Sequence, residues 1–179
     1  MAGRGGRTPL DPSTTPPMVI GLGNENRGDD ACGLLVARLL RTRLGPSVSV
    51  LERDAEGTEL LDLWSGRDLV VVVDAVKAGG PPGAVLRMEI GSEPLPTALT
   101  ATSSHGVSLG QAVALGQVLQ RLPKRLVLYG IEAANFDPGA SLSRPVAGAL
   151  ETVAFQIENE IRLHAEGTDR TASRGAPHA

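Results

Sequence analysis

The sequence Val19-Ile-Gly-Leu-Gly-Asn-Glu-Asn-Arg-Gly-Asp-Asp30 contains the features that decide the fold. A short apolar run leads into a glycine-containing bend, and two adjacent carboxylates follow it. Gly21 and Gly23 lack a Cβ, so the backbone can turn sharply or be approached closely at these positions. Apolar residues then recur at helical spacing, at Cys32, Leu35, Val36, Leu39 and Leu40. The stretch therefore predicts a strand, a tight loop and a helix, with polar groups gathered at the loop.

The two adjacent aspartates, Asp29 and Asp30, lie where the helical pattern begins. One of them is expected to cap the helix, because one side-chain oxygen suffices to accept the free backbone N–H groups and stabilises a helix by about 1 kcal/mol. The other carboxylate then has no evident structural task. It is a candidate functional residue.

Size and composition limit the possible classes of protein. The chain has 179 residues, of which 41% are hydrophobic, enough for one ordinary core. A net charge of -3 and 2% aromatic residues argue against a nucleic-acid partner. No apolar run approaches the roughly 20 residues of a membrane helix, and Cys32, the single cysteine, is most simply a buried hydrophobe. We expect a soluble, cytoplasmic monomer with no membrane partner.

The domain organisation follows from the composition along the chain. Residues 1–17 are rich in Gly, Pro, Ser and Thr, and the final residues have a similar polar character. We therefore expect one domain over residues 18–164, with disordered tails at 1–17 and 165–179.

Strand-like and helix-like segments alternate within this domain, which is typical of the α/β class. The run Val70 to Val73 is apolar on both faces, as expected for a central parallel strand covered on each side. The sequence predicts a three-layer sandwich, with a mostly parallel, twisted sheet of about five strands and helices on both faces. The predicted strands are 18–22, 48–51, 69–73, 84–88 and 125–129, and the predicted helices include 31–43 and 58–63.

Three further expectations concern the second half of the domain. The short turn at 78–83 favours an antiparallel hairpin, so the sheet is expected to be mixed. A helix after residue 105 is expected to bury Leu115, Val118, Leu119 and Leu122 on one face. A long helix is expected to close the domain.

Polar side chains follow the predicted strands at the edge where ligands gather in open α/β sheets. Asp30 follows the first strand, Asp74 ends the third, and His105 lies in a serine-rich loop before a helix. Two carboxylates and an imidazole form a ligand set for a divalent transition metal, with imidazole suiting nickel or zinc. The three residues together predict a metal site with open coordination positions.

Each of these residues also has a purely structural interpretation when it is taken alone, as a cap or a solvated loop residue. Glu132 ends the last strand and is placed to line the same edge, although it is more simply structural, as is Glu56. The sequence contains no His-Glu-x-x-His run and no Gly-x-Ser-x-Gly elbow, so a conventional zinc protease and a serine hydrolase are disfavoured.

The order of short motifs along residues 18 to 162 resembles that of the hydrogenase maturation endopeptidases, which trim the carboxyl terminus of the large subunit of nickel-iron hydrogenases. The set is specific as a whole, whereas the first motif alone is weak. The motifs are Gly21-Leu-Gly-Asn24 with Arg27-Gly-Asp-Asp30, Glu56-Gly-Thr-Glu-Leu60, Val73-Asp-Ala-Val76, Ser104-His-Gly106, Tyr129-Gly-Ile-Glu132 and Gly139-Ala-Ser-Leu-Ser143.

This resemblance implies a site, a substrate and a metal. By likeness to the family, Asp30, Asp74 and His105 occupy the metal-binding positions, and we expect the same residues to be catalytic. Independently of the resemblance, Asp29 and Glu132 are candidates for orienting the attacking water. The partner would be the precursor large subunit of a nickel-iron hydrogenase, with nickel already inserted. The nickel would thus be carried by the substrate, and zinc or cadmium would be able to replace it in a crystal.

Two other functions remain as alternatives. A nucleotide-binding module also uses a glycine-rich loop before a helix, but Asn26 stands where the third glycine of Gly-x-Gly-x-x-Gly is required, and two carboxylates would repel phosphate. A peptidyl-tRNA-hydrolase-like enzyme also begins with Gly-Leu-Gly-Asn, but the net negative charge and the scarcity of aromatic residues argue against an RNA substrate.

Overall fold

The computed structural model describes residues 15–54, 57–91 and 109–174. One five-stranded sheet has the strand order β2-β1-β3-β5-β4. Four of its strands run parallel, and β4 is antiparallel to β5. The strands are β1 (Met18–Leu22), β2 (Ser49–Arg53), β3 (Leu69–Val76), β4 (Val85–Ile90) and β5 (Arg125–Glu132). The prediction of a mixed, mostly parallel sheet is confirmed.

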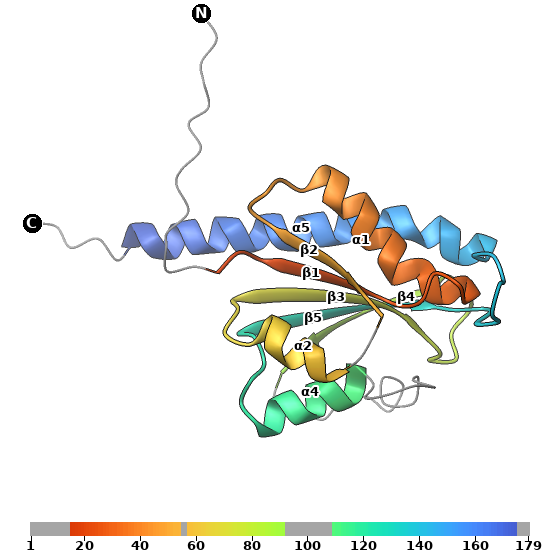
Figure 1. Ribbon diagram of the computed structural model, residues 1–179. Coiled ribbons are helices and arrows are strands. Elements are labelled where there is room, and N and C mark those ends of the chain that lie inside the picture. The colour runs from red at the N-terminus through yellow and green to blue at the C-terminus, as the bar shows by residue number, and fades with distance from the viewer. Residues whose placement is uncertain (1–14, 55–56, 92–108, 175–179) are drawn as a thin grey trace, which may run out of the picture.

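Helices cover both faces of this sheet, which gives three layers (Figure 1). On one face lie α1 (Cys32–Arg43), which follows the short helix η1 (Gly28–Ala31), and α5 (Arg144–Arg174). On the other face lie α2 (Gly57–Trp64) and α4 (Leu109–Val118). The α/β class and the three-layer architecture agree with the sequence-based prediction.

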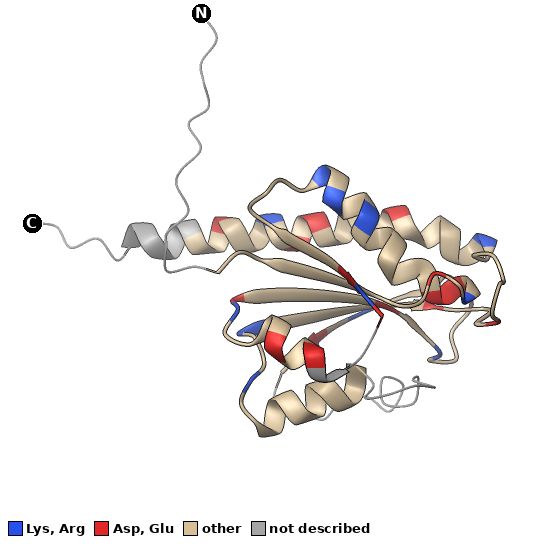
Figure 2. Ribbon diagram, viewed as in Figure 1, with Lys and Arg blue, Asp and Glu red and all other residues tan. Residues whose placement is uncertain are grey.

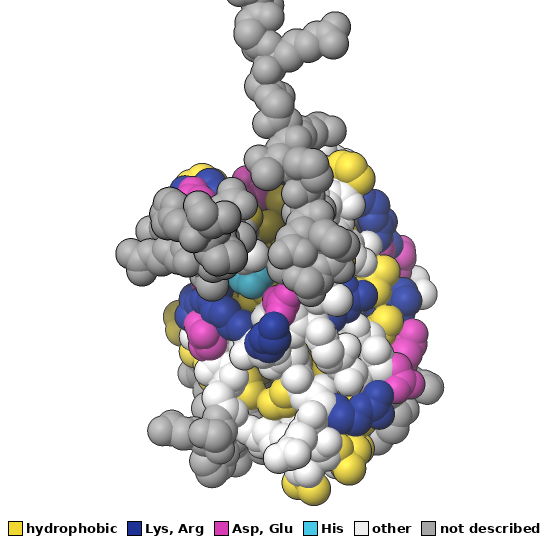
Figure 3. Space-filling view, turned by 90° about the vertical axis from the view of Figure 1, so that its left-hand side faces the viewer, with side chains coloured by type: hydrophobic (Ala, Val, Ile, Leu, Met, Phe, Trp, Pro, Cys, Tyr) yellow, Lys and Arg dark blue, Asp and Glu magenta, His cyan; other side chains and the backbone are white. Residues whose placement is uncertain are grey.

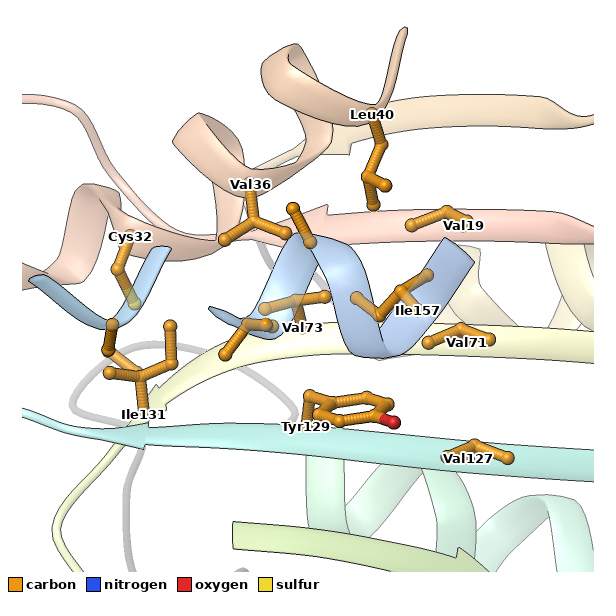
Figure 4. Packing of buried hydrophobic residues seen from close by; sticks show 14 of the residues in the cluster. Val19, Cys32, Val36, Leu40, Val71, Val73, Val127, Tyr129, Ile131 and Ile157 are labelled. Atoms are coloured by element: carbon orange, nitrogen blue, oxygen red, sulfur yellow. The ribbon is translucent and has the colours of Figure 1, made fainter. Parts of the chain in front are cut away.

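The central strand β3 has an apolar side chain on both faces because a helical layer covers each one. Val71 and Val73 pack in the cluster formed with α1 and α5, whereas Val70 and Val72 pack in the cluster formed with α2 and α4. Figure 4 shows the first cluster, in which side chains of β1, β3 and β5 meet those of α1 and α5. The four consecutive valines are therefore a consequence of the layered fold.

The position of β4 differs from the predicted hairpin. β4 pairs with β5 rather than with β3, which precedes it in the chain. β5 is buried along almost its whole length and therefore occupies a central place, whereas β4 alternates partly buried and exposed residues, as suits a strand at the edge of a sheet. The predicted hairpin between the third and fourth strands is wrong.

The predicted buried face of α4 is also wrong. Leu115, Val118 and Leu119 are exposed, Val118 at 81%. A face with three small residues is buried instead, and its members are Leu109, Gly110, Ala112, Val113 and Gly116. Of the predicted face, Leu122 is partly buried against the same cluster. A Cβ on Gly116 would lie 2.6 Å from a methyl carbon of Leu122, so the small face is the one that allows close packing.

The ends of the domain extend further than predicted. α5 continues to Arg174 and so includes residues 165–174, which the sequence assigned to a disordered tail. Local contacts support this continuation, because Arg162 forms an ion pair with Glu166 at 2.9 Å, one helical turn away. At the other end, the carbonyl oxygen of Pro17 accepts a 2.9 Å hydrogen bond from the backbone N–H of Ser49. Within the described ranges, no helix combines the length and apolarity needed to cross a bilayer.

Candidate active site

The loops that follow β1, β3 and β5 meet at the carboxyl edge of the sheet. Figure 1 shows η1 and the ends of these strands at the same end of the molecule, and Figure 2 shows acidic residues in η1 there. Asp29 and Asp30 lie in η1, and Asp74 lies near the end of β3. The topology therefore brings the predicted carboxylates to one edge.

Two glycines allow this loop to form. A Cβ on Gly21 would lie 2.1 Å from the carbonyl oxygen of Gly33, so a side chain there would exclude α1 from its place over β1. Gly23 has a φ of +136°, and a Cβ on it would lie 1.8 Å from the carbonyl oxygen of Asp30. Only glycine fits at either position. The glycine-containing bend thus places Asp30 directly beyond β1.

Asp29 has a structural task that differs from the expected helix cap. It is fully buried, and its carboxylate accepts backbone hydrogen bonds from Ala134 at 2.8 Å, Asn135 at 3.1 Å and Ser143 at 2.7 Å. Burial raises the pKa of Asp29, but these backbone donors lower it more, and the net shift is downward. Neither η1 nor α1 has a side-chain cap hydrogen bond. Asp29 therefore ties the loop after β5 to the loop after β1, in a position that a substrate cannot reach.

Asp30 and Asp74 are the two carboxyl groups of the candidate site whose pKa values are raised. Both are half-buried, and Oδ1 of Asp74 accepts a 2.8 Å hydrogen bond from the backbone N–H of Ala75. Burial and the negative charge of Asp30 raise the pKa of Asp74 to about 7. Burial also raises the pKa of Asp30, against the opposing effect of Arg27. Two partly desolvated carboxylates that repel each other would be stabilised by a divalent cation.

The third predicted ligand, His105, lies outside the described residues, as does Glu56. Among the residues that are described, no three His, Cys, Asp or Glu side chains are grouped closely enough to hold a metal ion. Two of the three predicted ligands, Asp30 and Asp74, lie in the described part of the chain, and metal binding by them stays a prediction. His105 as the third ligand stays a prediction.

Glu132 holds a loop rather than facing an open site. It is 6% exposed, and its two carboxylate oxygens accept hydrogen bonds from the backbone N–H groups of Ala78 at 2.9 Å and Gly79 at 3.0 Å. These contacts fix the loop after β3 against the end of β5. Glu132 thus positions one of the loops at the edge of the sheet.

Cys32 is buried in the core beneath the site, beside Ile131 (Figure 4). Burial raises the pKa of its thiol, and the nearby Asp74 and Asp30 raise it further. A thiol in this environment stays protonated and is a poor nucleophile. The expectation of a buried hydrophobic cysteine is confirmed.

Sequence reasoning missed three residues at the same edge. The ammonium group of Lys77 lies 4.9 Å from the centre of the Phe136 ring, and Nε of Arg27 donates a 3.4 Å hydrogen bond to the carbonyl oxygen of Phe136. The three residues come from the loops after β3, β5 and β1. Arg27 stands in the first motif but had no assigned role there. The only sequence signal for Lys77 and Phe136 was their position just beyond predicted strands, because nothing local links residues so far apart in the chain.

The fold and the carboxylate pair define an α/β protein with a candidate metal-recognition site at the carboxyl edge of its sheet. Comparison with solved structures supports the fold. The hydrogenase maturating endopeptidase HybD from E. coli superposes with a TM-score of 0.73 at 24% identity, covering 83% of this chain and 93% of that one. The [NiFe] hydrogenase maturation protease HycI from Thermococcus kodakarensis KOD1 has a TM-score of 0.63 at 30% identity, with the same coverage.

Sequence comparison gives the family. The hydrogenase expression/formation protein HupD from Thiocapsa roseopersicina is 29% identical over 80% of this chain and 66% of its own length. A family model for hydrogenase maturation proteases matches residues 34–160. The chain belongs to this family. Family membership favours the protease interpretation over the nucleotide-binding and peptidyl-tRNA-hydrolase-like alternatives.

Proposed function

We propose that this protein cleaves the C-terminal extension from the precursor large subunit of a nickel-iron hydrogenase after nickel has been inserted. The observation that carries the proposal is the pair of half-buried carboxylates, Asp30 and Asp74, at the carboxyl edge of the sheet in a chain of the maturation protease family. The fold brings the loops of three parallel strands to this edge, where a peptide segment of the precursor would bind.

In this proposal, Asp30, Asp74 and His105 complete the coordination of nickel that the precursor carries. Carboxylates and imidazole are ligands that divalent nickel accepts. The raised pKa of Asp74 means that, near neutral pH, metal binding displaces a proton from the carboxylate pair. Recognition of nickel would then hold the first peptide bond of the extension beside the same residues. The metal acts as a checkpoint, because a precursor without nickel lacks the group that the site recognises.

The chemical step requires a polarised carbonyl group and an activated water. Nickel is able to polarise the carbonyl or to activate water. Asp29 and Glu132 are committed to backbone hydrogen bonds, so they support this site by holding its loops.

The test compares nickel-loaded and nickel-free precursor as substrates for the purified protein, with the product mass as the readout. We expect cleavage of the nickel-loaded form only. Asp30→Asn, Asp74→Asn and His105→Ala should each abolish cleavage while the far-UV circular dichroism spectrum stays that of the wild type. Asp62→Asn is a matched control, because Asp62 lies in α2 with its side chain 78% exposed. Equal cleavage of both precursor forms would contradict nickel recognition, and full activity of a site variant would remove that residue from the site.

A further inference from the structure

A lysine lies beside the proposed site in a position that the cleavage mechanism does not use. Lys77 follows Asp74 by three residues and is exposed, and its ammonium group lies 4.9 Å from the centre of the Phe136 ring. The carbonyl oxygen of Phe136 accepts the hydrogen bond from Arg27. Phe136 therefore links the loops after β1, β3 and β5, and it holds the ammonium group at the same edge of the sheet as the two carboxylates.

The positive charge of Lys77 is not neutralised within the part of the chain that the structure describes. No described carboxylate lies within ion-pair distance of Lys77, whereas Lys124, at the opposite end of the sheet, pairs with Asp68 at 2.6 Å. Contact with an aromatic ring orients an ammonium group but leaves its charge in place. Lys77 is exposed, so its charge faces solvent.

The opposite end of the molecule differs in this respect. Figure 3 shows that end, where basic and acidic side chains lie next to one another. Lys124 and Arg121 lie in the segment that leads into β5, and their partners are Asp68, just before β3, and Asp62 in α2. Among the described lysines, Lys124 is paired with an acidic residue, whereas Lys77 at the carboxyl edge of the sheet is not.

We propose that Lys77, held on Phe136, binds a carboxylate group in the C-terminal segment of the precursor and so helps to select the substrate. This inference rests on the proposed function. An ammonium–carboxylate contact is charge-assisted and guides the approach of an oppositely charged partner. The carboxylate belongs either to an acidic side chain near the scissile bond or to the chain terminus of the extension. Lys77 is thus a specificity residue, outside the chemical step.

The first experiment measures steady-state cleavage of nickel-loaded precursor by the wild type, Lys77→Gln, Lys77→Arg and Lys124→Gln. We expect Lys77→Gln to raise KM about two- to fivefold, the effect of losing an exposed ion pair, with kcat within about twofold of the wild type. The difference should shrink at high salt, because salt screens exposed charges. Lys77→Arg should restore the wild-type KM. Lys124→Gln removes the same charge far from the site and should leave both constants unchanged.

The second experiment identifies the source of the carboxylate. In one precursor the acidic residues of the extension are changed to the corresponding amides, and in another a short Gly-Ser segment is added to displace the terminal carboxylate. Removing the carboxylate that contacts Lys77 should raise KM for the wild type. It should not raise KM further for Lys77→Gln, because that variant has already lost the contact and interacting groups give non-additive effects. If both precursors behave as the unmodified one does, the proposal is overturned.

Two outcomes separate this inference from the proposed function. If the wild type cleaves nickel-loaded precursor and Lys77→Gln has an unchanged KM and salt dependence, the role of Lys77 is rejected while the protease function stands. If the wild type does not cleave, the proposed function fails. Direct binding of precursor to the wild type and to Lys77→Gln then tests the lysine alone, and equal dissociation constants would reject it.

Discussion

The backbone N–H of Ser143 donates a 2.7 Å hydrogen bond to Oδ1 of Asp29, across 114 positions of the sequence. Oδ2 of the same carboxylate accepts from Ala134 and Asn135. One buried side chain thus fixes both ends of the loop between β5 and α5. It also fixes the loop that contains Asp30, which is the next residue in the chain.

Asp29→Ala is expected to lower the free energy of unfolding by about 3 kcal/mol, because it leaves buried backbone N–H groups without acceptors. Urea denaturation measures the difference. The exposed Asp62→Ala should stay within about 0.5 kcal/mol of the wild type, as surface substitutions usually do. Equal stability of Asp29→Ala and Asp62→Ala would show that Asp29 does not hold the loop.

The pH dependence of stability should show the lowered pKa of Asp29. A carboxylate with a lowered folded-state pKa contributes stability that is present above its unfolded value of 3.8 and is lost as the pH falls through the folded value. We therefore expect the stability difference between the wild type and Asp29→Asn to be constant at neutral pH and to shrink on strong acidification. A difference that is unchanged at low pH would contradict a stabilising charged form.

For Asp74, ionisation should lower the stability of the folded protein, whereas for Asp29 it should raise that stability. The folded-state pKa of Asp74, about 7, is raised above the unfolded value of 3.8, so its ionisation destabilises the folded protein as the pH rises through this interval. We expect Asp74→Asn to be more stable than the wild type by up to about 4 kcal/mol above pH 8, because amide replacement removes a desolvated charge and each unit of pKa shift corresponds to about 1.4 kcal/mol. The gain should vanish toward pH 4. A less stable Asp74→Asn at high pH would contradict the electrostatic cost.

Much of this site was predictable from the sequence, because its strands and glycines are local signals. The apolar run before Asp30 and the valines before Asp74 placed both carboxylates at the carboxyl edge, where the structure has them. The sequence did not show which of the adjacent aspartates is buried. That difference depends on backbone N–H groups more than 100 residues away, and no local pattern of Asp29 or Asp30 contains this information.

Tertiary neighbours also decided two of the features that the sequence predicted wrongly, the position of β4 and the buried face of α4. β4 lies at the sheet edge because the more completely apolar β5 takes the place beside β3. α4 buries its small residues because Gly116 allows close packing against Leu122 and α2, whereas the larger residues of the opposite face remain exposed. Helical periodicity correctly predicted a helix at α4. It did not show which of the two apolar faces of that helix would be buried.

The revised face of α4 gives a direct test. Val113→Ala is expected to destabilise the protein by about 1 to 2 kcal/mol, because it removes buried methyl groups from a packed core. Val118→Ala, the same change on the exposed face, should alter stability by less than about 0.5 kcal/mol. Urea denaturation of the pair provides the comparison. A larger loss of stability for Val118→Ala than for Val113→Ala would indicate that the face predicted from the sequence is the buried one.

Glu132 should influence cleavage by holding the loop after β3 in place, and it should take no part in the chemical step. Glu132→Gln keeps one acceptor oxygen but replaces the other with a donor that faces a backbone N–H group, so we expect a stability loss of about 1 to 2 kcal/mol. Cleavage of the precursor should be slowed but retained at a temperature where the variant is folded. Complete loss of kcat in the folded variant would return Glu132 to the catalytic residues.

The pH dependence of cleavage tests the carboxylate pair and the predicted imidazole together. Metal ligands must lose their protons to bind, so both Asp74, with a pKa of about 7, and His105, with an ordinary imidazole pKa of about 6.5, should limit activity in acid. We expect log(kcat/KM) to fall with a slope approaching two below about pH 6. The nickel content of the precursor, measured at each pH, controls for loss of the metal from the substrate. A rate that is constant between mildly acidic and neutral pH would exclude both groups as nickel ligands, and a limiting slope of one would leave only one of them in that role.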